Sequence, residues 1–190
     1  MKRLLTVAAL SLALSMGCRA QVSRVIDLPD WNFSRDGQSW QPVRVPHDWA
    51  ISGPFDKKWD LQMVAIEQNG ETEKTEKSGR SGALPWIGEG FYRMRLALPK
   101  GYKRAVLVFD GAMSEPVVSV NGREAGRWAY GYNAFRIDIT PFVKFGSKDN
   151  LVEVHLNNRE ESSRWYPGGG LYRPVHVELY GDAAFSPWDT

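Results

Sequence analysis

The sequence has a single cysteine, Cys18, among its 190 residues. One thiol cannot form a disulfide within a chain, so a disulfide-stabilised fold is excluded. A dominant sign of charge is also missing, because 24 basic residues nearly balance 22 acidic ones and leave a net charge of +2. Without a basic block, nucleic acid is a poor partner. No apolar run beyond the N-terminus is long enough to cross a bilayer, which predicts no integral membrane domain.

Signals for nucleotide and metal binding are missing as well. The glycines at 88–90 precede a predicted strand, and those at 168–170 lack the Lys-Ser/Thr of a phosphate loop. No nucleophile elbow or Ser-His-Asp order occurs. The three histidines, His47, His155 and His176, do not stand at metal-ligand spacing from each other or from a carboxylate cluster. The sequence therefore predicts no cofactor and no metal site.

Short strand patterns fill the chain after residue 22, and no window has the period of a long amphipathic helix. The continuous apolar run at 105–109 predicts a central strand that is covered on both faces. Asn121-Gly122 tolerates the positive φ of a type I′ turn and predicts a hairpin. One helical turn is expected at 140–143. The expected strands are 22–28, 31–33, 91–98, 105–109, 117–120, 123–128, 135–139, 151–156 and 175–179, and together they predict an all-β sandwich of antiparallel strands.

The N-terminus is typical of an export signal. Lys2 and Arg3 precede a short apolar run at residues 4–16. Two interpretations of its processing remain open. The segment ending at Cys18 resembles a lipobox, in which Cys18 is acylated and becomes the first mature residue, and the alternative is cleavage after Ala20. The signal is expected within residues 1–20, and both interpretations predict a chain that leaves the cytoplasm.

Residues 162–173, SSRWYPGGGLYR in one-letter code, form the most informative stretch. Aromatic residues make up 12% of the chain, with eight Trp, which suits either a sandwich core or a carbohydrate platform. A pyranose has apolar C–H faces and a polar rim, so it fits aromatic rings beside hydrogen-bonding groups. Here Pro167 and the following glycines would aim such groups in a set direction. The candidate substrate-binding residues are Ser163, Arg164, Trp165 and Tyr166.

This stretch resembles the Ser-Arg-Trp-Tyr-Pro-Gly-x-Gly-Leu/Ile-Tyr-Arg signature of the N-terminal sugar-binding domain of glycoside hydrolase family 2. Three further segments resemble that domain in the same order: VPHDW at 45–49 with GPF at 53–55, GEGFYR at 88–93, and FDGA at 109–112 followed by VSVNG at 118–122. The resemblance is β-galactosidase-like. It implies a jelly-roll β-sandwich over residues 21–182, with 183–190 as the start of a linker.

The resemblance implies a carbohydrate ligand, a β-galactoside or a related sugar, and a role in carbohydrate catabolism. Family 2 enzymes carry both catalytic glutamates on a barrel C-terminal to this domain, one of them in an Asn-Glu pair, and this sequence has no Asn-Glu dipeptide. We therefore expect no catalytic residue in this chain and no hydrolysis by it alone. The expected partners are the barrel and immunoglobulin-like domains of a full-length enzyme, so the chain is interpreted as a fragment or a truncated product.

Two alternatives remain: a free-standing carbohydrate-binding module, and a non-catalytic structural adaptor. We expect an exported location, either periplasmic or as a membrane-anchored lipoprotein of a Gram-negative bacterium. His47 is expected to hold its loop, with Asp48 orienting it or accepting a backbone hydrogen bond. The polar stretch 68–82 is interpreted either as part of a pocket rim or as a solvated loop, and a strand at 61–66 would lead into it.

Overall fold

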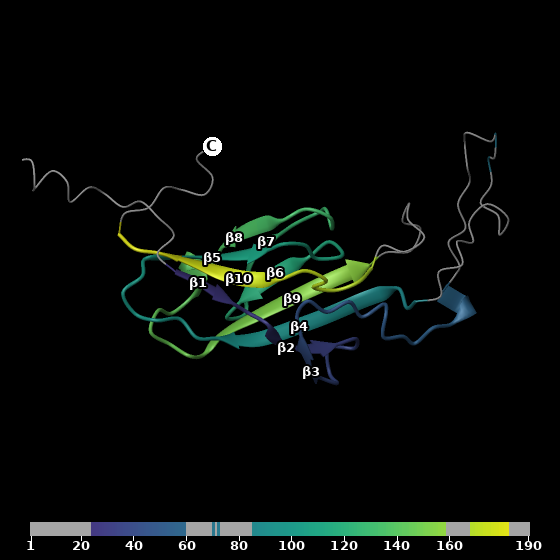
Figure 1. Ribbon diagram of the computed structural model, residues 1–190, viewed down its shortest axis with the longest axis horizontal. Helices are drawn as coiled ribbons and strands as arrows, with labels where there is room; N and C mark the ends of the chain where they lie inside the picture. The colour runs from purple at the N-terminus through teal and green to yellow at the C-terminus, as the bar shows by residue number, and fades with distance from the viewer. Residues whose placement is uncertain (1–23, 60–69, 71, 73–84, 159–167, 183–190) are drawn as a thin grey trace, which may run out of the picture.

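The protein is a sandwich of two antiparallel sheets in the computed structural model, which describes residues 24–59, 70, 72, 85–158 and 168–182. The two layers lie one over the other in Figure 1. The smaller sheet has the order β1 (Arg24–Asp27), β10 (Val175–Tyr180), β5 (Arg104–Phe109) and β8 (Phe135–Asp138). The larger sheet has the order β3 (Gln41–Arg44), β2 (Asp30–Ser34), β4 (Gly88–Leu96), β9 (Asn150–Asn158), β6 (Val117–Val120) and β7 (Arg123–Arg127).

This architecture confirms the predicted all-β sandwich and is consistent with a jelly roll. The two long strands, β4 and β9, pair along their whole length from Gly88 opposite Asn158 to Leu96 opposite Asn150. Alternation of side chains sends Tyr92 into the core and leaves Arg93 and Arg95 on the outer face, because successive residues of a strand point to opposite faces. The charged residues of β4 therefore lie on the outside, as the pattern predicts.

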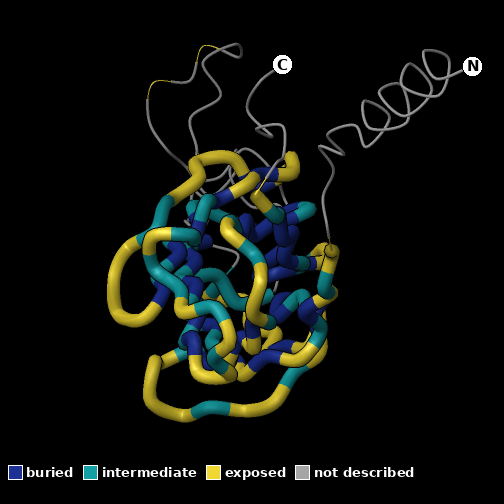
Figure 2. Tube along the Cα trace, turned by 90° about the vertical axis from the view of Figure 1, so that its left-hand side faces the viewer, coloured by how far each residue is buried: buried dark blue, intermediate teal, exposed yellow. Residues whose placement is uncertain are grey.

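β5 is the buried centre of the smaller sheet. It pairs with β10 on one side and β8 on the other, and all its residues from 105 to 109 are buried. The prediction of a central strand covered on both faces is confirmed. Residues of both sheets are buried (dark blue in Figure 2) and belong to one core, which includes Trp31, Phe33, Tyr92, Leu107, Phe109, Val152, Val154, Leu156, Val177 and Leu179.

The Asn121-Gly122 hairpin turn is confirmed between β6 and β7. Asn121 has a φ of 52° and Gly122 a φ of 76°, the left-handed conformation at both central residues that a type I′ turn requires. The Asn121 side chain also donates to the carbonyl oxygen of Phe142 at 2.8 Å. Phe142 ends the short 3₁₀ helix η3 (Thr140–Phe142), so the expected helical turn is present as well.

Strand β3 and the 3₁₀ helix η1 (Lys57–Trp59) were not predicted from the sequence. β3 contains Pro42, which has no N–H for a ladder and is tolerated here because β3 pairs only with β2, at the edge of its sheet. The signal segment with Cys18, the strand expected at 61–66, the candidates Ser163 to Tyr166 and the linker 183–190 all lie outside the described residues.

Candidate functional site

The glycine run at 168–170 is joined to the segment that contains His47 and Trp49. The backbone N–H of His47 donates to the carbonyl oxygen of Leu171 at 2.7 Å, and that of Trp49 donates to the carbonyl oxygen of Gly169 at 3.1 Å. The predicted role of His47 in holding its loop is therefore confirmed, and its backbone N–H makes the contact. Two motifs about 120 residues apart in the sequence form one structural unit.

Asp48 links the same two segments through its side chain. Its Oδ1 accepts the N–H of Ala50 at 2.8 Å, which closes a local turn, and also the N–H of Gly169 at 3.0 Å. The expectation that Asp48 accepts a backbone hydrogen bond at a turn is confirmed. One carboxylate oxygen thus fixes both the loop and the glycine run beside it.

The stretch 159–167 is bounded by two residues that contact each other. The side-chain Nδ2 of Asn158, the last residue of β9, donates to the carbonyl oxygen of Gly168 at 2.8 Å in a buried environment. Two residues further on, Gly170 and Met113 exchange backbone hydrogen bonds of 2.9 Å in both directions. The residues on either side of the stretch that carries the candidate sugar contacts are therefore held in place and form its base.

The glycines are needed because the aromatic side chains lie against their backbone. A Cβ on Gly169 would collide with the indole Nε1 of Trp49. Gly170 has a φ of +100°, and a Cβ there would lie 2.6 Å from the carbonyl oxygen of His47 and would also collide with the hydroxyl of Tyr92. Only glycine combines this backbone conformation with this close approach.

His47 is half-buried and is held by Tyr92. Its Nδ1 lies 2.7 Å from the Tyr92 hydroxyl, and its ring packs against Phe33 at a centroid distance of 5.0 Å. Burial lowers the pKa of His47 below its ordinary value; the Asp48 carboxylate opposes this effect and the Arg35 guanidinium adds to it. Burial also raises the pKa of the Tyr92 phenol, so Tyr92 keeps its proton. The pair is neutral and serves as a structural hydrogen bond.

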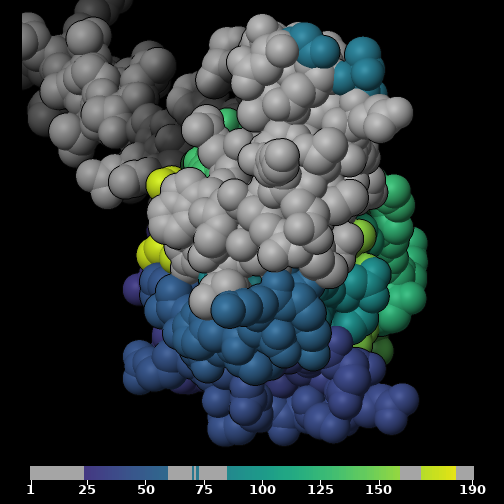
Figure 3. All heavy atoms as spheres, turned by 90° about the vertical axis from the view of Figure 1, so that its right-hand side faces the viewer, coloured from purple at the N-terminus to yellow at the C-terminus, as the bar shows by residue number. Residues whose placement is uncertain are grey.

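A groove of about 790 Å³ adjoins this unit, and His47 and Trp49 belong to both. Figure 3 shows the end of the molecule where β9 ends and β4 begins. Residues 50–59 are blue and lie above β2 and β3, which are purple. The groove has an aromatic wall and a polar rim, the composition expected of a site for a small polar ligand. It is lined by Phe33, Ser34, Arg35, Asp36, Ser39, Trp40, Gln41, His47, Trp49, Ser52, Gly53 and Pro54.

Two arginines lie over tryptophan rings at this groove. The guanidinium of Arg93 lies 3.8 Å from the ring centroid of Trp40, and that of Arg35 lies 5.0 Å from the centroid of Trp86. Arg35 also donates to the carbonyl oxygen of Gly53. These cation–π contacts order the aromatic rings while keeping charge at the rim.

Asp36 makes the turn after β2 rigid. Its Oδ1 accepts the N–H groups of Gln38 at 2.8 Å and Ser39 at 2.7 Å, and the hydroxyl of Ser34 lies 2.8 Å away. These hydrogen bonds, that of Ser39 first, hold the pKa of the Asp36 carboxyl well below its ordinary value. In the sequence, Arg35-Asp36-Gly37 is turn-like and carries no sign of a binding site. Its place on the groove follows from packing against residues 47–54, for which the sequence carries no local signal.

Trp49 contributes a polar atom without a partner. The side chain is 1% exposed, and its indole Nε1 has no hydrogen-bond partner among the residues described. Because the same nitrogen faces the backbone of Gly169, the buried donor lies next to the glycine run. Buried donors of this kind are rare in folded proteins and mark places where a further acceptor belongs.

Metal sites and membrane-spanning helices are both absent from the described parts of the chain. There, no group of three His, Cys, Asp or Glu side chains is arranged to hold a metal ion. Over the same residues, no helix has the length and apolar character needed to cross a membrane. His155 packs its ring on Phe91 at a centroid distance of 4.7 Å, which is a structural contact.

The sequence is similar to a small part of each of several much larger enzymes. A β-galactosidase of Bacteroides ovatus, BoGH2A, is 33% identical over 154 residues, which is 80% of this chain and 16% of that enzyme. A putative β-glucuronidase of Formosa agariphila is 32% identical over 164 residues, which is 85% of this chain and 14% of that protein. No protein-family model matches the chain.

Solved structures show the same fold in the same class of enzymes. A glycosyl hydrolase family 2 member from Bacteroides cellulosilyticus superposes with a TM-score of 0.66 at 27% identity, over 83% of this chain and 21% of that one. A β-glycosidase from Bacteroides vulgatus superposes with a TM-score of 0.62 at 26% identity, over 83% of this chain and 20% of that one. The chain spans less than a quarter of each of these proteins.

Proposed function

Since this chain is a domain of glycoside hydrolase family 2, we propose that it helps to shape the sugar subsite of a larger, exported β-glycosidase. The catalytic carboxylates would come from a barrel domain of the same full-length enzyme. Hydrolysis needs two carboxyl groups about 5 to 9.5 Å apart on either side of the glycosidic bond. We assign no such pair to this chain and expect it to have no hydrolytic activity alone.

The observation that carries the proposal is the fixed base of the stretch 159–167. Asn158 and Gly168 are hydrogen-bonded to each other, and Asp48 and Trp49 anchor the next residue, Gly169. A contact surface carried on a pre-ordered base loses less conformational entropy on binding. This supports a role for Ser163, Arg164, Trp165 and Tyr166 in contacting a sugar beside the aromatic groove.

The proposed ligand is a β-galactoside or a β-glucuronide. The groove supports a saccharide because it combines aromatic rings with polar and charged groups at its rim. Export is proposed from the signal at residues 1–20, with Cys18 as a lipidation site in one interpretation and cleavage after Ala20 in the other.

A kinetic comparison of the full-length enzyme tests the subsite role. Trp165→Ala should lower kcat/KM for an aryl β-galactoside or aryl β-glucuronide by about tenfold, the equivalent of 1.4 kcal/mol, because one face of the subsite is removed. Val25→Ala, at an exposed position of β1, is the control and should leave kcat/KM unchanged. Wild-type kinetics for Trp165→Ala would reject the subsite role.

Titration calorimetry on the chain without residues 1–20 separates this proposal from a free-standing binding module. Saturable binding of galactose or glucuronic acid, weakened by Trp165→Ala, would favour the module. A folded sample that binds neither monosaccharide would favour a wall of a larger active site. Turnover of an aryl β-glycoside by this chain, free of host enzyme, would contradict the expected lack of hydrolysis.

A further inference from the structure

The loop between β7 and β8 carries three exposed aromatic side chains. Trp128 is 38% exposed, Tyr130 57% and Tyr132 41%. The rings of Tyr130 and Tyr132 lie 5.5 Å apart at an angle of 54°. A soluble domain gains nothing from exposing three large rings within five residues, so this surface points to a ligand or a partner.

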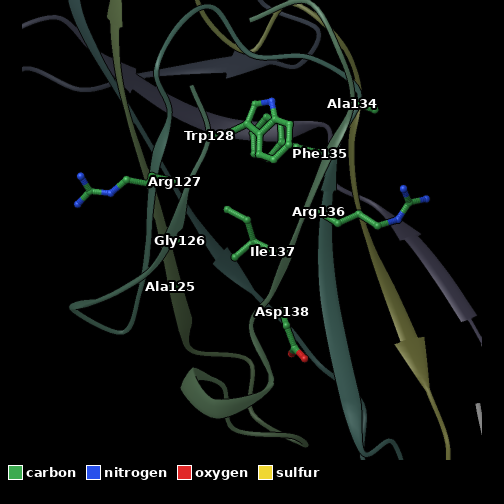
Figure 4. A pocket seen from close by; sticks show the side chains of 9 residues that line it. All are labelled: Ala125, Gly126, Arg127, Trp128, Ala134, Phe135, Arg136, Ile137 and Asp138. Atoms are coloured by element: carbon green, nitrogen blue, oxygen red, sulfur yellow. The ribbon is translucent and has the colours of Figure 1, made fainter. Parts of the chain in front are cut away.

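Ring stacking and hydrogen bonds hold this loop in one conformation. The indole of Trp128 stacks on Phe135 at a centroid distance of 5.7 Å and an angle of 7°, as Figure 4 shows, and its Nε1 donates to Oδ1 of Asn133 at 2.9 Å. The hydroxyl of Tyr172 donates to the carbonyl oxygen of Gly131 at 2.8 Å. The exposed tyrosines therefore stand on a rigid base, which favours binding over free motion.

The exposed rings carry unused polar groups. Among the described residues, no hydrogen bond to the phenol oxygen of Tyr130 or Tyr132 is present. Burial raises the pKa of the nearby Tyr172 phenol, which stays protonated as the donor to Gly131. The guanidinium of the exposed Arg173 lies 5.4 Å from the ring centroid of Tyr172. Two ring faces, two phenol hydroxyls and the Arg173 cation, which also donates to the carbonyl oxygen of Asp110 at 3.4 Å, thus lie around Tyr172.

This surface adjoins the base of the stretch 159–167. A Cβ on Gly131 would collide with Sδ of Met113, so the aromatic loop is seated directly on Met113. Met113 in turn is the backbone partner of Gly170. The loop that carries the exposed tyrosines and the residues that follow the stretch 159–167 therefore lie side by side.

The groove of about 590 Å³ between β7 and β8 is a different feature. In Figure 4, Ile137 points into it, whereas the side chains of Arg127 and Arg136 point away from it on either side. It is an open gap between the edge strands of the two sheets, and both apolar and charged residues line it.

We propose that Tyr130, Tyr132 and Arg173 form a second saccharide-binding surface, for a pyranose unit next to the one held at residues 163–166. The ring faces would stack on the C–H face of the sugar, and the phenol hydroxyls would bind its hydroxyls. Arg173 would favour a unit that carries a carboxylate, because a guanidinium binds carboxylates in a bidentate manner. The proposal rests on the proposed function for its neighbouring subsite.

The test is an NMR titration of the chain without residues 1–20 with β-1,4-diglucuronate and cellobiose, which share the β-1,4 linkage and differ at C6. The tyrosine ring resonances of Tyr130 and Tyr132 should shift with both sugars. The double variant Tyr130→Ala/Tyr132→Ala should weaken binding at least tenfold, and Arg173→Gln should weaken binding of diglucuronate more than that of cellobiose. Val25→Ala should bind as the wild type does, and circular dichroism checks that each variant is folded.

The outcomes separate this surface from the neighbouring subsite. Binding that Trp165→Ala abolishes, with no shift at Tyr130 or Tyr132, would overturn the second surface and leave the proposed function standing. Binding lost in the double variant but kept in Trp165→Ala would support the second surface and count against the subsite. Absence of binding, or an unchanged Kd with altered self-association of the double variant in sedimentation, would overturn the saccharide surface.

Discussion

Asn158 donates a hydrogen bond from its side chain to the carbonyl oxygen of Gly168, and this single contact of 2.8 Å joins the end of β9 to the start of the glycine run. It is buried, and it spans ten positions of the sequence. The nine residues between them include every side chain proposed to contact the sugar at the first subsite. The base of that stretch is thus set by the sandwich itself.

Replacing Asn158 by Ala should destabilise the protein by about 1 to 3 kcal/mol, because the buried carbonyl of Gly168 loses its donor. Asn157→Ala is the matched control, since its side chain lies on the other face of the same strand, and it should change stability by no more than about 0.5 kcal/mol. Urea unfolding measures both. Equal effects of the two variants would show that the contact contributes nothing specific.

Gly170→Ala should be far more damaging than Gly101→Ala. Both positions have a positive φ, +100° and +91°, so both variants carry a similar backbone strain of about 1 kcal/mol. Gly101 has open space around it, whereas a Cβ at Gly170 would lie 2.6 Å from the carbonyl oxygen of His47. We expect Gly170→Ala to lose at least about 2 kcal/mol more in denaturant unfolding. Similar midpoints for the two variants would contradict this packing.

Stability should fall at acid pH partly through His47. Its folded pKa is lowered by burial, so the unfolded state takes up the proton first as the pH falls below its ordinary value of about 6.5. The contribution of the neutral side chain is complete above that pH and is lost as the pH falls toward the folded pKa. His47→Gln should show a shallower loss of unfolding free energy between pH 7 and 5, and a parallel loss would reject this assignment.

Tyr92→Phe should lose about 1 kcal/mol, because the hydroxyl that lies 2.7 Å from Nδ1 of His47 is removed while the ring stays in the core. Tyr102→Phe is the comparison, since Tyr102 packs on the same core without being fully buried. Thermal unfolding of both variants tests the difference. A Tyr92→Phe variant as stable as Tyr102→Phe would mean that the His47 contact is energetically neutral.

The sandwich could be predicted because its signals are local. Alternation along β4 and β9, the apolar run of β5 and the Asn121-Gly122 turn each specify a conformation from neighbouring residues alone. β3 was missed because Pro42 argues against a strand unless its place at a sheet edge is known. Edge position is a property of the assembled sheet.

Of the candidate site, only the residues that hold its loop, His47 and Asp48, could be predicted from the sequence. The sequence indicated that His47 and Asp48 hold a loop, because a short acidic side chain at a turn can accept a hydrogen bond from a backbone N–H two residues later. It gave no sign that Arg35 and Trp40 line a groove with them, because these residues meet only when β2 packs beside residues 47–54. The roles of Ser163 to Tyr166 stay predictions.

Because Asn158 and Gly168 contact each other, the sequence between them can change while its two ends stay in place. Two anchor points that already touch leave the sandwich insensitive to what lies between them, and the entropy of closing a loop grows only slowly with its length. Insertions, deletions and substitutions at those nine positions should therefore be tolerated without loss of the fold.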